Sequence, residues 1–456
     1  MTVYLARGMP AEPRLSPTGC ARDEGAAGPL DPDVHVVRTA LGPFLLVVDG
    51  SRVYGITEDL ANELERAAPG TTRRVLADAG VLRDTPYVDD ATPADPPIRA
   101  LSLAVAQKCN LGCTYCYAEQ GTFGGEARDM SWEIAETSVL RLLDGAGAGD
   151  RVNLSFLGGE PLSNRALVQR ATEMCARLAS ERKIRATFSI TTNGTLLSEE
   201  DAAFFETYAF SVTVSLDGIG AVHDAQRPFQ GGGGSYERIV RRVRPLLAMA
   251  RRASVSARVT VTPDNLGLHE TLDELITLGF GSVGFSPMLR SPTGRAQMGD
   301  SDLDVLLHEM IACAEIAEAK WLRGERYPFS NLESALREIH RGTHRPYPCG
   351  AGSSYHGVAA DGALAACHRF VGEPAGIMGH VDAGVDRLAQ RTWLANRHVH
   401  RQDPCTKCWA RYLCGGGCHH EVLARGRPAC AYIRGWLHHC VGAYIRIDEH
   451  RPELLQ

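Results

Sequence analysis

The sequence has no long apolar run and no strong excess of charge of either sign. None of its hydrophobic stretches approaches the ~20 residues of a membrane-spanning helix. Its first segment, MTVYLARGMPAEP, lacks the apolar core of a secretion signal. We therefore expect a cytoplasmic protein with no membrane partner. Lysine and arginine total 48 against 54 aspartate and glutamate, a formal net charge of −6, so electrostatics give no reason to expect a nucleic-acid partner.

A disulfide framework is not expected either, although the chain has 14 cysteines. The cytosol keeps thiols reduced, so metal or redox chemistry explains such a cysteine content better. Most of the cysteines form two groups, one near residue 110 and one between residues 349 and 440. The sequence therefore indicates two metal-binding regions.

The first third of the chain divides into a tail, a small domain and a linker. Residues 1–34 are rich in Pro, Gly and Ala, and we expect them to be disordered or loosely attached. Residues 35–90 predict three short strands followed by two helices, which make a small α+β domain. The Pro- and Asp-rich stretch DTPYVDDATPADPP is typical of a linker.

Residues 99–300 alternate between apolar strands and amphipathic helices. Six such units predict an α/β fold, a partial (β/α)6 barrel, because a closed barrel of eight needs ~250 residues. Unusual residues follow the first four strands and are expected to meet at one rim, where active sites of such folds lie. They are Cys109 after the first strand, GGEPL after the second, TTNGT after the third and SLDG after the fourth.

The last third predicts a helical connector at 301–344 and a Gly- and Cys-rich region at 345–445. This region has few long periodic segments, so apolar burial alone would stabilise it poorly. Bound metal can supply the missing folding free energy.

The stretch KCNLGCTYCYAEQG places Cys109, Cys113 and Cys116 in one loop without a fourth cysteine. A structural zinc site needs four ligands, whereas a four-iron cubane held by three thiolates keeps one iron open. The C-x3-C-x-aromatic-C spacing, with Tyr115 as the aromatic residue, resembles the radical S-adenosylmethionine (SAM) enzymes.

This resemblance implies the cofactors and several of their contacts. In that family the open iron chelates SAM, and one electron from the cluster generates a 5′-deoxyadenosyl radical that abstracts hydrogen. Gly158, Gly159 and Glu160 resemble the family's GGE motif, in which the glutamate accepts hydrogen bonds from the methionyl ammonium. Further cofactor contacts are implied for Tyr115, Thr192, Asn193, Ser215 and Arg227.

The second cysteine group has the spacing C-x2-C-x5-C-x3-C, with two cysteines before it and two after. A zinc ribbon is one interpretation. Beside a radical SAM motif, the group resembles a SPASM domain, which carries two auxiliary 4Fe-4S clusters and brings the total to three. The resemblance assigns Cys349, Cys367 and Cys418 to the first auxiliary cluster, which leaves open whether one of its irons is free. It assigns Cys405, Cys408, Cys414 and Cys430 to the second, with Cys440 as the alternative to Cys430.

Longer runs narrow the resemblance. CTYCYAEQGTFGG, CGAG, AACHRFVG and CWARYLCGGGCHHEV look like thioether-forming radical SAM/SPASM peptide maturases of the quinohemoprotein amine dehydrogenase maturation type. This implies a peptide or small Cys-rich protein as substrate, cross-linked from Cys to Asp or Glu, and an external electron donor. Residues 35–90 would then be a winged-helix-like domain that holds a peptide by strand addition, or a structural cap.

Asp217 is the candidate catalytic residue. An acid at a strand end beside the radical could exchange a proton with the substrate or orient it, or it could cap the next turn. Two other functions remain open: another radical modification, such as carbon–carbon cross-linking or epimerisation, and a zinc-stabilised binding protein without catalysis.

Overall fold

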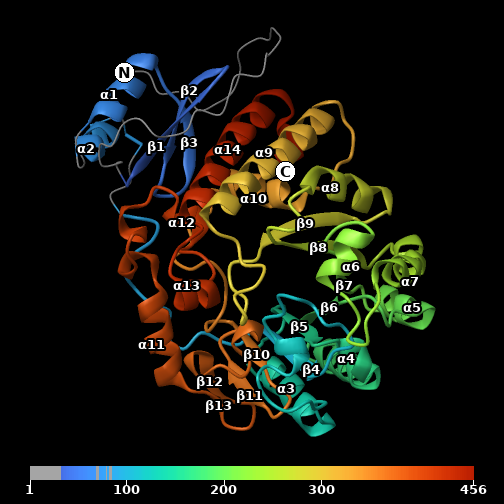
Figure 1. Cartoon of the computed structure of the whole chain (residues 1–456). Coiled ribbons are helices and arrows are strands. Elements are labelled where there is room, and N and C mark those ends of the chain that lie inside the picture. The colour runs from blue at the N-terminus through green and yellow to red at the C-terminus, as the bar shows by residue number, and fades with distance from the viewer. Residues whose placement is uncertain (1–31, 68–70, 79, 82–84, 456) are drawn as a thin grey trace.

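The computed structural model describes residues 32–67, 71–78, 80–81 and 85–455. The loosely attached segment expected at residues 1–34 lies outside these ranges except for its last three residues. The described chain forms two sheets, one of three strands and one of ten (Figure 1). The larger sheet contains the predicted barrel strands and continues beyond them.

The smaller sheet and two helices form the amino-terminal unit. Strands β1 (Val34–Thr39), β2 (Gly42–Val47) and β3 (Arg52–Gly55) are antiparallel. Helices α1 (Glu58–Arg66) and α2 (Thr71–Asp78) follow, as the periodicity predicts. The strands and helices share a small apolar core of their own, made of Val34, Leu45, Val47, Leu60, Leu64 and Leu76. The unit lies beside the carboxyl-terminal helix (Figure 1).

Six parallel strands form the predicted partial barrel, in the order of the sequence. They are β4 (Ala100–Ala106), β5 (Arg151–Gly158), β6 (Arg185–Thr192), β7 (Ser211–Ser215), β8 (Ser254–Val261) and β9 (Ser282–Pro287). The helices between them are α3 (Trp132–Asp144), α4 (Arg165–Glu181), α5 (Glu199–Thr207), α6 (Ala221–Gln226), α7 (Tyr236–Met249) and α8 (Leu268–Thr277).

Alternation along the strands separates the helix-covered face from the inner face of the barrel. On β8 the side chains of Val255, Ala257, Val259 and Val261 are buried, and the residues between them are polar. Successive side chains of a strand point to opposite faces, so the polar set lines the barrel interior. β4 differs, because residues 101–106 are all buried, as expected for a strand that is covered on both faces.

The sheet does not end at β4. From the Cys-rich region, β10 (Tyr355–Val358) pairs in parallel with β4, with Tyr355 opposite Ala100. Strands β11 (Ala363–Ala365), β12 (Ile377–His380) and β13 (Gly384–Val385) extend it in antiparallel fashion. Residues on both sides of the connector thus share one hydrogen-bonded sheet.

Helices form much of the chain after β9. The connector consists of α9 (Asp300–Leu322) and α10 (Ser330–His340). After it come α11 (Arg387–Arg397), α12 (Arg411–Cys414), α13 (His419–Arg425) and α14 (Cys430–His450). α14 packs on α9 and α10 and, with 21 residues, is the one long helix in the described part of the Cys-rich region. Within the described ranges, no helix is both long and apolar enough to cross a membrane.

Candidate radical SAM site and auxiliary cysteine groups

The three amino-terminal cysteines lie in the loop after β4. Cys113 is half-buried, and desolvation raises its pKa to about 12, while the Arg227 guanidinium opposes this rise. Cys116 and Cys109 lie close enough to influence its pKa, so the three thiols face one small region. Desolvated thiols of this kind need a soft cation before they can ionise.

The two glycines of GGEPL allow the β5 loop to approach the cysteine loop. Gly158 has φ +150°, and a Cβ atom there would lie 2.3 Å from the Ala106 carbonyl oxygen. A Cβ atom on Gly159 would lie 2.2 Å from the Lys108 carbonyl oxygen. The Glu160 amide donates to that same oxygen at 2.9 Å. The backbone of the two glycines therefore lies against the backbone of Ala106 and Lys108, just before Cys109.

Glu160 joins the ends of β5 and β6. Its buried carboxylate accepts hydrogen bonds from the Thr192 hydroxyl (2.7 Å), the Asn193 amide (2.7 Å) and the Leu162 amide (3.0 Å). Burial raises the Glu160 pKa to about 6, and these hydrogen bonds oppose the rise. The structure brings Glu160, Thr192 and Asn193 together, as the sequence predicts.

Asn193 links this group to the cysteine loop. Its side-chain amide donates to the Asn110 side-chain oxygen at 2.9 Å and lies 3.6 Å from the Cys109 sulfur. Its own oxygen accepts from the Thr195 amide and hydroxyl. Asn193 is thereby fixed against the first cysteine.

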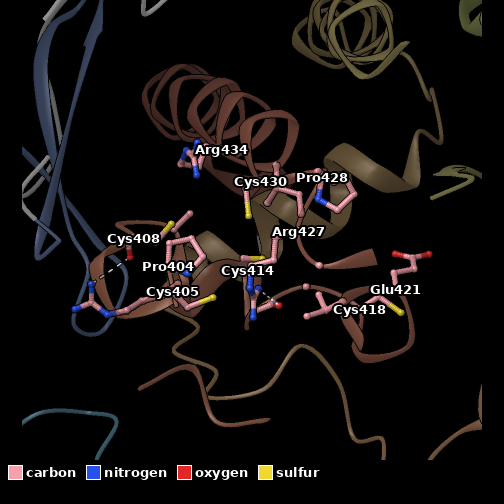
Figure 2. Close-up of a pocket in the computed structure, with 18 of the residues that line it drawn as sticks. Pro404, Cys405, Cys408, Cys414, Cys418, Glu421, Arg427, Pro428, Cys430 and Arg434 are labelled. Carbon is pink, nitrogen blue, oxygen red and sulfur yellow. Dashed lines mark hydrogen bonds between the residues drawn. The ribbon is translucent and has the colours of Figure 1, made fainter. Parts of the chain in front are cut away.

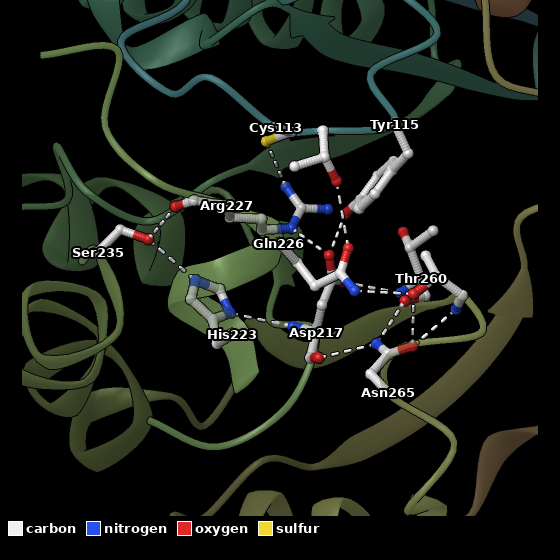
Figure 3. Close-up of polar contacts among 11 residues, drawn as sticks. Cys113, Tyr115, Asp217, His223, Gln226, Arg227, Ser235, Thr260 and Asn265 are labelled. Atoms are coloured by element: carbon white, nitrogen blue, oxygen red, sulfur yellow. Dashed lines mark hydrogen bonds and ion pairs between the residues drawn. The ribbon is translucent and has the colours of Figure 1, made fainter. Parts of the chain in front are cut away.

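Asp217 and Arg227 form a buried ion pair below Cys113 (Figure 3). The Arg227 Nε atom donates to Asp217 Oδ2 at 2.6 Å, and Arg227 Nη1 lies 3.8 Å from the Cys113 sulfur. The Tyr115 hydroxyl donates to the same Asp217 oxygen. Tyr115 and Arg227 thus both contact Asp217, and the Arg227 guanidinium reaches from this carboxylate to a cysteine sulfur.

The second carboxylate oxygen of Asp217 is occupied too. The Thr260 amide donates to Oδ1 at 2.7 Å, and the Asp217 carbonyl accepts from the Asn265 side chain at 2.8 Å (Figure 3). His223 accepts from the Asp217 amide. Ser215, two residues earlier on β7, lies in register with Arg258 of β8.

Four carboxyl-terminal cysteines gather around one cavity (Figure 2). Cys405, Cys408, Cys414 and Cys430 line it, with their sulfur atoms on facing sides. The pKa of Cys405 is influenced by the nearby thiols of Cys414, Cys408 and Cys430. Cys440 is fully buried elsewhere on α14, and burial alone raises its pKa. This placement favours Cys430 as the fourth member of the group.

Cys349, Cys367 and Cys418 form a separate trio. Cys418 and Cys349 both lie close enough to Cys367 to influence its pKa, and Cys418 likewise influences the pKa of Cys349. Cys418 also borders the four-cysteine cavity, where Figure 2 shows it to one side, near Glu421. The tail therefore presents a group of three thiols and a group of four.

The donors in all three groups fit iron–sulfur clusters. Each group consists of soft thiolates, and buried cations lie beside two of them. Arg227 is close to Cys113, and the Arg369 Nη1 atom lies 3.7 Å from the Cys418 sulfur. Positive charge near a cluster stabilises its anionic thiolate ligands.

Several residues near these cysteines were not singled out from the sequence. Tyr117 follows Cys116 directly, and the thiols of Cys116 and Cys367 both lie close enough to influence its pKa. The Arg369 guanidinium lies 5.3 Å from the Tyr117 ring centroid. Tyr117 thus lies between the radical SAM cysteines and the trio. An aromatic residue after a cysteine carries no signal of such a position, because its neighbours come from a region 250 residues away in the chain.

Comparison with known proteins identifies the class of the central domain. Residues 103–286 match the Radical SAM superfamily model, and this range covers β4 to β9 with its three-cysteine loop. This part of the chain is therefore similar to the Radical SAM superfamily, and the similarity supports a 4Fe-4S cluster and SAM as cofactors. The chain has the α/β radical SAM fold, with a Cys-rich region after it.

Curated relatives extend over most of the chain. A serine-type anaerobic sulfatase-maturating enzyme of Klebsiella aerogenes is 25% identical over 355 residues, which are 74% of this chain and 83% of the relative. An AdoMet-dependent heme synthase of Oleidesulfovibrio alaskensis is 27% identical over 51% of this chain and 55% of the relative.

Two groups of solved structures share the fold. Native anSMEcpe with bound AdoMet matches with a TM-score of 0.65 at 19% identity, over 77% of this chain and 99% of that one. Streptococcus suis SuiB bound to precursor peptide SuiA matches with a TM-score of 0.51 at 14% identity, over 88% and 97%. At these identities the likeness concerns the fold.

Proposed function

We propose that this protein is a radical SAM peptide maturase that forms thioether bonds between a cysteine sulfur and a carbon of Asp or Glu in a peptide or small protein. The observation that carries the proposal is the division of the carboxyl-terminal cysteines into a trio and a group of four. A cubane held by Cys349, Cys367 and Cys418 would keep one iron open. A substrate thiolate is a suitable ligand for that position.

A peptide substrate is also consistent with the relatives. One relative is a sulfatase-maturating enzyme, and the fold is shared with SuiB, which binds the precursor peptide SuiA. An enzyme that acts on polypeptides needs a way to hold them, and the sheet of β1–β3 is a candidate for strand addition.

The residues of this chain bind and orient the reactants. The cofactors supply a 5′-deoxyadenosyl radical that abstracts hydrogen. Cys109, Cys113 and Cys116 would hold the radical SAM cluster, and Glu160 would accept hydrogen bonds from the SAM ammonium. Asp217 keeps Arg227 oriented toward Cys113.

The proposed reaction replaces one C–H and one S–H bond by a C–S bond. The hydrogen atom from carbon goes to 5′-deoxyadenosine, and the thiol proton goes to solvent. The reaction also releases one electron. Cys349, Cys367 and Cys418, or the group of four, would hold the auxiliary cluster that would supply an acceptor for it. The peptide thus loses two hydrogen atoms for each bond.

The test uses the full chain, reconstituted anaerobically with iron and sulfide, with SAM, a reductant and candidate peptides containing Cys and Glu. Release of 5′-deoxyadenosine together with a peptide that has lost two hydrogens and no longer reacts with iodoacetamide would support the proposal. A carbon–carbon link would leave the thiol reactive, and epimerisation would leave the mass unchanged. Zinc without sulfide in the purified protein would instead indicate a non-enzymatic metal protein.

A further inference from the structure

The inner face of the half-barrel is polar, and Arg258 brings a positive charge to it. On β8, Ser256, Arg258 and Thr260 alternate with the buried residues that pack on the helices. Their side chains therefore point away from the helices, into the barrel. Arg258 is exposed to solvent, and its strand lies between β7 and the edge strand β9.

The Arg258 guanidinium is held at one side only. Its Nη2 atom donates to the Ser286 hydroxyl on β9 at 3.0 Å. Gly284 lies opposite Arg258 on β9, and a Cβ atom there would be in van der Waals contact with Nη1, at 3.6 Å. Within the described residues, the other N–H groups of the guanidinium have no hydrogen-bond partner.

Arg258 has no carboxylate partner in the described part of the chain, in contrast to Arg227 and Arg369. Arg227 pairs with Asp217 at 2.6 Å, and Arg369 pairs with Glu421 at 2.6 Å. Among residues 32–67, 71–78, 80–81 and 85–455, no acidic group lies within ion-pair distance of Arg258.

The surroundings make this an unfavourable place for an unpaired cation. Although Arg258 reaches solvent, the protein atoms around it exclude much of the water, and this desolvation lowers its pKa; repulsion by Arg369 lowers the pKa further, and Glu421 opposes the shift. A guanidinium that is partly removed from water gains most from a carboxylate, because the planar fork can donate two parallel hydrogen bonds to it.

Arg258 also lies between the two sets of cysteines. The Leu216 amide donates to the Arg258 carbonyl, and the Thr260 amide donates to Asp217, which leads to Cys113 through Arg227. On the other side, Arg369 is a charged neighbour of Arg258 and contacts Cys418.

We propose that Arg258 binds the side-chain carboxylate of the Asp or Glu residue that the enzyme modifies. The inference rests on the proposed function and adds a substrate-binding residue to it. The guanidinium would hold the acidic side chain in the barrel, with the carbon next to the carboxylate between Cys113 and Cys418. A glutamine or asparagine side chain lacks the charge and would be bound more weakly.

The test compares two labelled peptides that differ only in Glu or Gln beside a cysteine, with anisotropy as the binding readout. The reconstituted wild-type chain is expected to bind the Glu peptide about tenfold more tightly. In Arg258→Gln the preference should vanish, and Arg258→Lys should keep part of it. Arg185→Gln is the matched control, because Arg185 lies at the amino end of β6 and donates to the Gly149 carbonyl.

Two parallel measurements make the outcomes distinct. SAM binding, measured by equilibrium dialysis, should be equal in Arg258→Gln and wild type, and its loss in that variant would instead assign Arg258 to the SAM carboxylate and overturn the inference. Equal binding of both peptides by the wild type, or an unchanged preference in Arg258→Gln, would overturn it as well. Absence of 5′-deoxyadenosine with an intact Glu preference would refute the proposed function and leave carboxylate binding by Arg258 supported.

Discussion

Asp217 has each of its carboxylate oxygens engaged by neighbours within the protein. Arg227 and Tyr115 share one oxygen, and the Thr260 amide donates to the other. These three donors fix the orientation of the buried carboxylate. This arrangement favours a positioning role, in which Asp217 orients Arg227 and Tyr115, over direct proton exchange with a substrate.

Glu160 gives a pH-dependent prediction at the same scale. Its pKa of about 6 means that the carboxylate is charged at neutral pH and becomes protonated as the pH falls through about 6. If it accepts hydrogen bonds from the SAM ammonium, the affinity for SAM should fall over that range. Glu160→Gln should bind SAM about tenfold more weakly at pH 8 and show little further change at pH 5.5.

Equilibrium dialysis with labelled SAM checks this. The control is Glu181→Gln, since Glu181 is exposed on α4 and, among the described residues, forms its ion pair with Arg177. An identical pH dependence in Glu160→Gln and wild type would contradict the assignment of Glu160.

At the scale of elements, helix α14 separates two cysteines that the sequence leaves as alternatives. Cys430 is its first residue and Cys440 lies ten residues further on, about 15 Å along the axis. One metal cluster cannot use both positions. Cys430 borders the four-cysteine cavity, whereas Cys440 is packed in the core. We therefore predict that Cys430 binds iron and that Cys440 does not.

Iron and sulfide analysis after anaerobic reconstitution tests this prediction. Cys430→Ser should lower both by up to the content of one 4Fe-4S cluster, and Cys440→Ala should leave both unchanged. Thermal unfolding of Cys440→Ala verifies that its core tolerates the change. Full iron content in Cys430→Ser would exclude this residue as an essential ligand.

Much of the barrel could be predicted because its signals are local. Each of the six strands carries its own periodicity, and the residues expected at the rim, such as Glu160 and Asn193, meet there as strand order requires. β10 could not be found in this way, because YHGV is short and pairs with β4 far away in the chain. Arg258 gave no signal either, since alternation on a strand does not reveal which polar face encloses a cavity.

At the scale of the whole molecule, the amino-terminal sheet docks on the Cys-rich region. The His35 ring of β1 stacks on Trp409 with 3.7 Å between centroids, and its Nε2 atom lies 2.8 Å from His438 Nδ1. Asp33 pairs with Arg411 at 2.8 Å. Trp409 follows Cys408 directly, so this contact joins the sheet of β1–β3 to the group of four cysteines.

This docking should weaken in acid. Burial lowers the His35 pKa to about 3, and His438 adds to the shift. A detached His35 would have a pKa near ~6.5, so below that pH the detached state binds a proton that the docked state does not. Hydrogen exchange in β1 and β2 should therefore be less protected at pH 5 than at pH 7, after correction for intrinsic rates.

His35→Phe is the matched variant, because phenylalanine can still stack on Trp409 but does not titrate. Its protection should be the same at both pH values. An equal loss of protection in wild type and variant would show that another group controls the contact.

The pairing of β10 with β4 has a consequence for engineering. Exchange of the carboxyl-terminal half between homologous enzymes would cut through a continuous β-ladder, with Tyr355 opposite Ala100 and Val358 opposite Leu103. A functional chimera would have to preserve this strand register, because a shift by one residue turns every side chain of β10 to the other face. Module boundaries for such hybrids are thus better placed at the amino-terminal linker than between the barrel and the Cys-rich region.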